Sequence, residues 1–150
     1  MLHAKIINSN ETELKLSDAE NFLKSKKFGA SIYFIGTVRD INENKNVTGI
    51  TYDAKDTMVI KSFEEIYNDA KDVLGISNLA VFIEHIKGYV PLSEKSIIIG
   101  VACKHRDEAY SLSRYIIEEI KKRSPIWKKE RYENEESEWL KGSPIANEKV

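Results

Sequence analysis

The sequence has few of the features that mark secreted or membrane proteins. It contains one cysteine, Cys103, so no internal disulfide can form, and this usage fits a reducing compartment. No run of about 18 apolar residues occurs, so we expect no membrane-spanning helix. Residues 1–5 lack an apolar signal core ahead of the first charged side chain. These absences predict a cytoplasmic protein that contacts no membrane.

The chain also lacks the segments that divide a sequence into domains. With three prolines and seven glycines in 150 residues, it has no Pro/Gly-rich linker, and it has no repeat or low-complexity tract. Its hydrophobic fraction of 41% is ordinary for a globular protein, and the length suffices for one buried core. We predict a single domain over residues 1–150, with a tail from about residue 133 as its more flexible part.

Common catalytic signatures are missing as well. There is no phosphate-binding loop, Rossmann glycine pattern, zinc-protease motif or serine-nucleophile elbow. Residues 103–105 could supply half of a metal site, but no second Cys/His pair lies at ligand spacing, so we predict neither a metal nor a bound cofactor. Cys103 continues the alternation of the apolar residues before it and is expected in the core. We interpret His3 and His85 as incidental.

The charge of the chain is unevenly distributed. The net charge is -1, yet the segment from Lys104 to Arg131 holds nine Lys and Arg against five Asp and Glu. A locally basic segment in a slightly acidic chain favours a small anionic ligand or an acidic peptide over long nucleic acid, which needs a broad basic face. A solvated helix with ion pairs explains the charge alone equally well.

Three segments have the pattern of helices. A capping-box spacing predicts a short helix over residues 17–27. Apolar residues at three- and four-residue spacing predict a longer helix over residues 59–74, which Gly75 ends. A similar pattern predicts a third helix that begins at Asp107 as its N-cap and ends before Pro125.

Runs of β-branched and aromatic residues predict strands between these helices. The strands are residues 30–38, 47–52, 79–86 and 96–103, with a further strand after Trp127. Residues 40–46, with three asparagines, predict a loop, and Gly88 and Pro91 predict a turn between the last two of these four strands. The order of elements predicts an α+β fold: a single-domain sandwich with a mixed or antiparallel sheet packed by helices.

Two candidate anion sites follow predicted strands. The first strand delivers Arg39 to the sheet edge, where a guanidinium can bind a phosphate or carboxylate with two parallel donors. From this segment alone, a surface arginine paired with Asp40 is the simpler interpretation. His105 and Arg106 join a buried strand to a helix N-terminus, whose amides and dipole favour anions.

A third candidate site spans the end of the last helix and the segment after it. A basic last turn suits a helix C-terminus, and this explains Lys121 without any chemistry. After Pro125, Ile126 and Trp127 are expected to pack onto the core, so Lys128 lies beside an apolar wall. A partly desolvated lysine among other cations loses its proton more readily and can act as an acid, base or nucleophile. The residues alone therefore predict an anion-binding α+β protein with candidate catalytic lysines.

Several short motifs follow one another in a defined order. They are Phe28-Gly29-Ala30, Gly36-Thr37-Val38-Arg39, Tyr52-Asp53-Ala54, Ile86-Lys87-Gly88, Gly100-Val101, His105-Arg106 and the stretch KRSPIWKKE over residues 122–130. Together they resemble the MoaE family, the catalytic (large) subunits of molybdopterin synthase, over about residues 28–139. The last stretch is the most specific.

The resemblance implies an α/β-hammerhead type of sandwich and a sulfurtransferase of molybdenum cofactor biosynthesis. In this family a small ubiquitin-like partner carries a thiocarboxylate on its C-terminal Gly-Gly. Two sulfurs are added in succession to cyclic pyranopterin monophosphate, forming the dithiolene of molybdopterin. No reactive cysteine is needed, and a basic site suits two anionic reactants. The resemblance also implies a homodimer of large subunits within a heterotetramer.

The resemblance assigns roles to the candidate residues. Lys121 is expected near the terminal glycine of the partner, and Lys128 as the main proton donor or acceptor, so both are catalytic and contact substrate. Arg39, His105 and Arg106 are expected to bind the phosphate or the pterin, the last two supplied by the other copy of a homodimer.

Two departures from the family pattern stand out. Lys55 occupies a position where an aromatic residue is common, and residues 133–139 lack the Asp-Gly turn often found before the tryptophan. Two other functions stay open: a non-enzymatic module that binds a phosphate ligand or an acidic peptide, and an RNA-binding fold, which would show a steep salt dependence.

Overall fold

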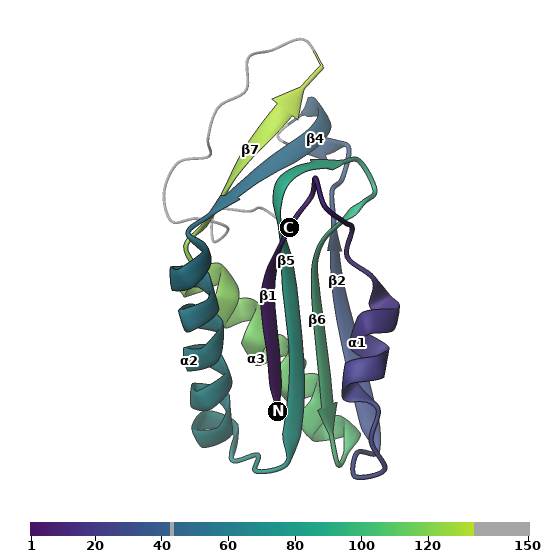
Figure 1. The fold of residues 1–150 in the computed structure, drawn as a ribbon, viewed down its shortest axis with the longest axis vertical. Helices are drawn as coiled ribbons and strands as arrows, with labels where there is room; N and C mark the ends of the chain where they lie inside the picture. Colours follow the sequence, from purple (N-terminus) through teal and green to yellow (C-terminus); the bar gives the residue numbers. More distant parts are fainter. Residues whose placement is uncertain (43, 134–150) are drawn as a thin grey trace.

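The computed structural model describes residues 1–42 and 44–133, which form helices on both faces of a mixed sheet (Figure 1). In chain order the elements are β1 (Leu2–Asn8), α1 (Leu16–Leu23), β2 (Ala30–Thr37), β3 (Ile41–Asn42), β4 (Lys45–Ala54), α2 (Asp56–Leu74), β5 (Leu79–Pro91), β6 (Lys95–Cys103), α3 (Arg106–Arg123) and β7 (Ile126–Tyr132). The predicted α+β class is confirmed.

The long strand β5 organises the sheet. Its first part pairs antiparallel with β6, and β1 runs parallel along its other edge. Its last part pairs with β4, which also carries β3 and β7, and β2 closes the far edge beside β6. The change of partner falls at Gly88, whose φ of 112° and close approach to Ser9 exclude a side chain. The sheet therefore consists of two parts that share β5.

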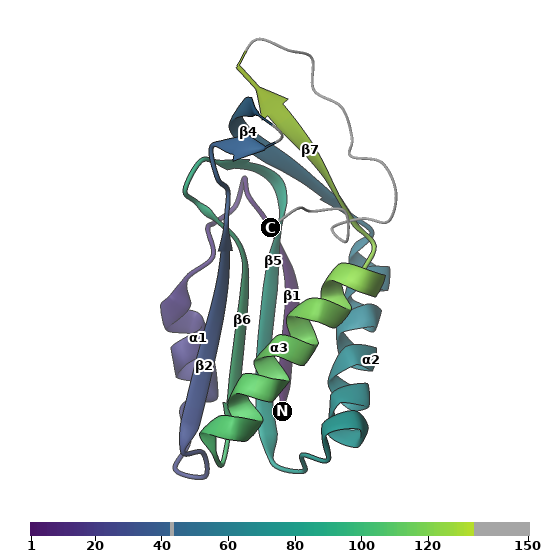
Figure 2. The same cartoon turned by 180° about the vertical axis from the view of Figure 1, so that it is seen from behind.

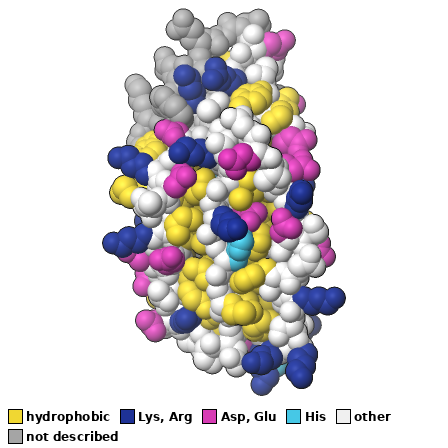
Figure 3. Space-filling view, in the orientation of Figure 1, with side chains coloured by type: hydrophobic (Ala, Val, Ile, Leu, Met, Phe, Trp, Pro, Cys, Tyr) yellow, Lys and Arg dark blue, Asp and Glu magenta, His cyan; other side chains and the backbone are white. Residues whose placement is uncertain are grey.

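The helices cover the two faces unequally. The amphipathic helices α2 and α3 pack together on one face, over β1, β2 and β6 (Figures 1 and 2). The shorter α1 covers only part of the other face, and Figure 3 shows hydrophobic side chains gathered on the part left open. No helix among the described residues is long and apolar enough to cross a membrane.

The helix predictions are confirmed in place but not at every boundary. Gly75 ends α2 with a φ of 65°, and α3 ends at Arg123, before Pro125, as expected. The expected N-caps are wrong: α1 begins at Leu16 and stops at Leu23, and His105 rather than Asp107 precedes α3. Burial of the apolar residues on each helix decides these boundaries, because a cap contributes about 1 kcal/mol and can be overridden.

The strand predictions are confirmed for the core and wrong at several ends. β1 was not predicted, and β5 continues through the expected turn at Gly88 to Pro91. The chain turns after Pro91 instead, at Ser93, which has a φ of 68° and donates its N–H to the Val38 carbonyl at 2.8 Å. The loop expected over residues 40–46 contains β3, paired with the start of β4. The departure noted at residues 133–139 lies, after Glu133, outside the described residues.

Candidate active site

Lys128 lies in a buried row of side chains on β7. Residues alternate between the two faces of a strand, and Ile126, Lys128 and Glu130 are 0%, 4% and 2% exposed. The cross-strand neighbour of Lys128 on β4 is Tyr52, which is 5% exposed. Buried charges in proteins are stable only with partners, and here a lysine and a glutamate share one face of one strand. The expected burial of Lys128 is confirmed.

The surroundings of Lys128 differ from the prediction in two ways. Trp127 points to the opposite face of β7 and opposes Asp53, so the apolar wall beside Lys128 comes from Ile126 and Tyr52. Glu130 adds a carboxylate to a row that was expected to hold cations. Alternation along the strand places this carboxylate on the same face of β7 as Lys128, two residues away.

Lys121 lies in the last turn of α3, just before β7. Two neighbouring cations of that turn form ion pairs: Lys122 with Glu119 at 3.5 Å and Arg123 with Asp69 at 2.9 Å. These pairs explain the exposed charges of the helix end, as the purely structural interpretation predicted. Lys121 is half-buried and lies on a different side of the helix.

The turn between α3 and β7 is rigidly built. The N–H of Ser124 donates a hydrogen bond to the Ile120 carbonyl at 3.0 Å, and the Ser124 carbonyl accepts a hydrogen bond from the N–H of Ile126 at 2.8 Å. Its hydroxyl lies 2.7 Å from that of Ser62 on α2, in a buried pair. The chain therefore passes directly from the helix that carries Lys121 to the strand that carries Lys128.

Arg39 lies near the C-terminal end of β7, whereas Lys121 precedes the start of that strand. Arg39 is exposed and precedes Asp40, whose carbonyl accepts a hydrogen bond from Val47 at 2.7 Å. Val47 opposes Tyr132, four residues along β7 from Lys128. From the rise per residue of a strand, Tyr132 and Lys128 lie about 13 Å apart along β7. A ligand that contacts Lys128 could therefore contact Arg39 only through a different part of the ligand.

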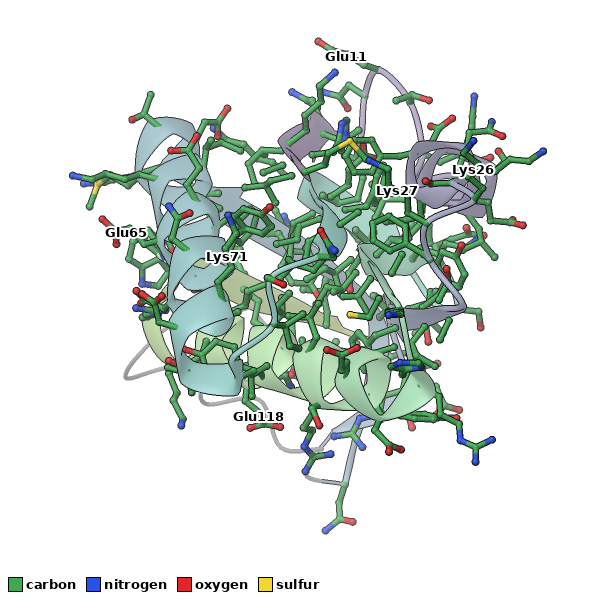
Figure 4. All side chains as sticks on the ribbon, turned by 90° about the horizontal axis from the view of Figure 1, so that it is seen from below. Glu11, Lys26, Lys27, Glu65, Lys71 and Glu118 are labelled. Atoms are coloured by element: carbon green, nitrogen blue, oxygen red, sulfur yellow. The ribbon has the colours of Figure 1, made fainter. Side chains whose placement is uncertain are left out.

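His105 and Arg106 lie at the far end of α3. Both are exposed, and the rise of an α-helix places Arg106 about 22 Å from Lys121 along the axis. Figure 2 shows α3 along its length, with β7 starting at the opposite end. Near this end of the molecule, exposed Lys26 and Lys27 (Figure 4) lie in the loop after α1, and the following Gly29 donates its N–H to the carbonyl of Cys103, at the end of β6. A single protomer therefore does not bring these residues to the lysines.

Sequence reasoning missed three residues of the Lys128 region. Tyr52 and Glu130 were not singled out as site residues, and His85 was interpreted as incidental. His85 is 2% exposed, and its ring lies edge-on to Tyr52 with centroids 4.9 Å apart. The alternation along β7 could have indicated Glu130, whereas the contact of His85 with Tyr52 depends on the pairing of β4 with β5.

Cys103 is buried in the core, as expected. Its side chain is 0% exposed, and burial, with a smaller contribution from Glu108, raises the pKa of the thiol to about 11. A thiol in this state is a poor nucleophile near neutral pH. Among residues 1–42 and 44–133, no three His, Cys, Asp or Glu side chains converge as metal ligands would.

A match to the family described as MoaE protein extends over residues 9–123. A molybdopterin synthase catalytic subunit of Synechococcus elongatus is 38% identical, covering 91% of this chain and 82% of that protein. The protein of the same name from Pyrococcus abyssi is 34% identical, with 87% and 86% covered. The chain spans 37% of the length of the Drosophila melanogaster relative, to which it is 33% identical.

Solved structures show the same fold. The crystal structure of molybdopterin synthase from Staphylococcus aureus matches with a TM-score of 0.84 and 27% identity, over 92% of this chain and 96% of that one. A complex of subunits 1 and 2 of molybdopterin-converting factor from Helicobacter pylori matches with a TM-score of 0.70 and 27% identity, over 88% and 86%. From the extent of the family match and the identity to these relatives, this chain belongs to the MoaE protein family.

Proposed function

We propose that this protein is the catalytic subunit of a molybdopterin synthase. In this role it transfers sulfur from the C-terminal thiocarboxylate of a small ubiquitin-like carrier to cyclic pyranopterin monophosphate. The observation that carries the proposal is the burial of Lys128 on β7, directly after the helix that presents Lys121. Family membership supports it, and a module that merely holds an anion has no need of a buried lysine.

The two lysines suit the two anionic reactants. Lys121, half-buried at the helix end, can neutralise the carboxyl group of the carrier terminus as charge develops on it. Lys128 can give or take a proton at the pterin. In each transfer the carrier sulfur forms a C–S bond at the pterin, and the oxygen that it replaces leaves with the electrons of the broken C–O bond. Water then hydrolyses the thioester that joins carrier and pterin, so the sulfur stays on the pterin and the carrier keeps a carboxylate. Two transfers complete the dithiolene.

A second copy of the chain completes the site in this proposal. His105 and Arg106 lie about 22 Å along α3 from Lys121, too far to share one small substrate within a protomer. A homodimer can bring the start of one α3 to the β7 region of the other. Arg39 binds the phosphate or the pterin at the other end of β7. With one carrier for each large subunit, the assembly is a heterotetramer, and the Helicobacter pylori complex of two subunits supports this arrangement.

We place the reaction in the cytoplasm. The single cysteine and the lack of a membrane-spanning helix among the described residues are compatible with that compartment. A reducing compartment also protects the carrier thiocarboxylate from oxidation.

Replacement of Lys128 tests the proposal. With thiocarboxylated carrier and precursor supplied, Lys128→Ala is expected to lower the rate of dithiolene formation by about 100-fold or more, because the proton-transfer group is removed. Carrier binding, measured by calorimetry, should stay unchanged. The control is Lys129→Ala, which removes the adjacent lysine from the opposite face of β7. Undiminished turnover by Lys128→Ala would rule out its catalytic role.

Co-purification tests the partner. We expect the chain to form a stable complex with a small ubiquitin-like protein that ends in Gly-Gly, and to lose it when those two residues are deleted. A chain that binds no such carrier, or that binds oligonucleotides with a steep salt dependence, would be one of the non-enzymatic modules instead.

A further inference from the structure

His85 is a buried titratable residue to which the proposed chemistry gives no role. It lies on β5, on the sheet face that α2 and α3 cover, and its side chain is 2% exposed. Burial of an imidazole among apolar groups is costly unless its polar atoms have hydrogen bonds. A core position of this kind is normally filled by an aliphatic residue, as it is at Val81 and Ile83 on the same face of β5.

One hydrogen bond defines the state of the His85 ring. The Nδ1 atom lies 2.7 Å from the carbonyl oxygen of Ile86. A carbonyl oxygen can only accept, so Nδ1 carries a proton and the ring orientation is held by the backbone of its own strand. The histidine is therefore a fixed aromatic surface inside the core.

The ring of His85 packs against Tyr52. The centroids are 4.9 Å apart and the planes are inclined at 75°, an edge-to-face contact. Tyr52 lies on β4 directly opposite Lys128 on β7 and opposite Gly88 on β5. Directly opposed side chains on neighbouring strands have Cβ atoms about 5 Å apart and restrict one another's rotamers.

We propose that His85 is a positioning residue for Lys128. Its ring, held by the hydrogen bond to Ile86, fixes the rotamer of Tyr52, and Tyr52 forms the wall that orients the Lys128 side chain toward the substrate. The inference rests on the proposed function of Lys128. It adds His85, on β5, as a residue that orients Lys128 through Tyr52, on β4. His85 itself touches neither substrate nor carrier.

Kinetics of His85→Phe tests this role. The variant keeps an aromatic ring beside Tyr52 and removes the hydrogen bond that orients it. In the complex with thiocarboxylated carrier, kcat for dithiolene formation is expected to fall about 10- to 100-fold, as for a misplaced catalytic group, with KM nearly unchanged. His85→Asn, which retains a donor for the Ile86 carbonyl and loses the ring, is the second variant and takes the place of His85→Phe if that chain does not fold.

A double-mutant cycle separates positioning from general damage to the fold. If His85 acts through Tyr52, the double variant His85→Phe/Tyr52→Ala should have a kcat less than about twofold below that of Tyr52→Ala alone. If the two residues act independently, the two losses in kcat multiply. The matched control is His3→Phe, which changes a half-buried histidine on the opposite face, stacked on Phe82, and should leave kcat unchanged.

The outcomes are distinct. A wild-type kcat in His85→Phe, or a loss of the same size in the Tyr52→Ala background, would overturn the positioning role while leaving Lys128 as the catalytic residue. Wild-type protein that forms no dithiolene with thiocarboxylated carrier would overturn the proposed function, and the role of His85 with it.

Discussion

At the scale of single residues, the lysines near the end of α3 differ in exposure. Lys128 is 4% exposed, whereas the Lys122 side chain is 69% exposed and paired with Glu119. Lys121 lies between these extremes, half-buried at the same helix end. A surface ion pair contributes little, about 0–1 kcal/mol, so replacement of Lys122 is expected to cost little.

We therefore expect Lys121→Ala and Lys122→Ala to behave differently. Lys121→Ala should lower kcat/KM for dithiolene formation by about 100-fold, because a charge that stabilises the developing oxyanion is lost. Lys122→Ala should stay within about twofold of wild type. The measurement is steady-state turnover with thiocarboxylated carrier. Equal losses in the two variants would indicate a general electrostatic effect of the helix end instead of a specific role for Lys121.

The cysteine gives a second residue-scale prediction. Because burial raises the pKa of Cys103 to about 11, stability linked to this thiol is present below its unfolded pKa and is lost as pH rises toward 11. At pH 7.5 the thiolate is scarce, so alkylation by iodoacetamide should be about 100-fold slower in the folded chain than in urea.

Cys103→Ala should still form dithiolene, since the sulfur arrives on the carrier. Mass spectrometry of the alkylated chain and the turnover assay check the two expectations. Rapid labelling of the folded protein, or loss of turnover in Cys103→Ala, would contradict the interpretation of Cys103 as a core residue.

At the scale of elements, the turn from α3 to β7 determines how Lys121 and Lys128 are spaced. Ser62 on α2 holds this turn through its buried contact with Ser124. Ser62→Ala leaves the Ser124 hydroxyl without that partner, so the free energy of unfolding should fall by about 1–3 kcal/mol. Replacing both serines by alanine should cost no more than the single change, because no hydroxyl is then buried alone.

Urea denaturation of Ser62→Ala, Ser124→Ala, the double variant and Ser111→Ala checks this expectation. Ser111 is an exposed serine of α3, so its replacement should change stability by less than about 0.5 kcal/mol. A double variant that loses the sum of two single losses would show that the two hydroxyls do not form an exclusive pair.

The same scale shows which elements a sequence can predict. The helices α2 and α3 were predicted because their apolar residues repeat every three to four positions, a pattern that depends on one helix alone. β1 was missed because its pattern is short, and its pairing partner, β5, lies more than 70 residues away in the chain. The continuation of β5 beyond Gly88 was not predicted. A glycine can mark a turn, but it can also lie within a strand where the strand changes its pairing partner, as Gly88 does with its positive φ.

At the scale of the whole molecule, one protomer does not bring all the predicted site residues together. His105 and Arg106 lie at one end of α3 and Lys121 at the other (Figure 2). If the other copy supplies them, a mixture of Lys128→Ala and Arg106→Ala chains will regain activity. Random exchange of subunits makes half of the dimers hybrid, each with one intact site, so about a quarter of wild-type turnover is expected.

Each variant alone should be inactive, and the mixture should be assayed after denaturation and refolding together so that subunits exchange. A mixture as inactive as its components would show that each chain uses its own Arg106. Sedimentation of the complex with carrier provides the independent check of a heterotetramer.

Local pattern and motif order determined the α+β class, the two long helices, the core strands and the family of this protein, because each depends on neighbours in the chain. The pairing of Lys128 with Tyr52 and the contact of His85 with Tyr52 were decided by tertiary structure alone. The physical reason is that a side chain's exposure and partners are set by strand pairing and helix packing. Those contacts join residues that are far apart in sequence, and no local periodicity records them.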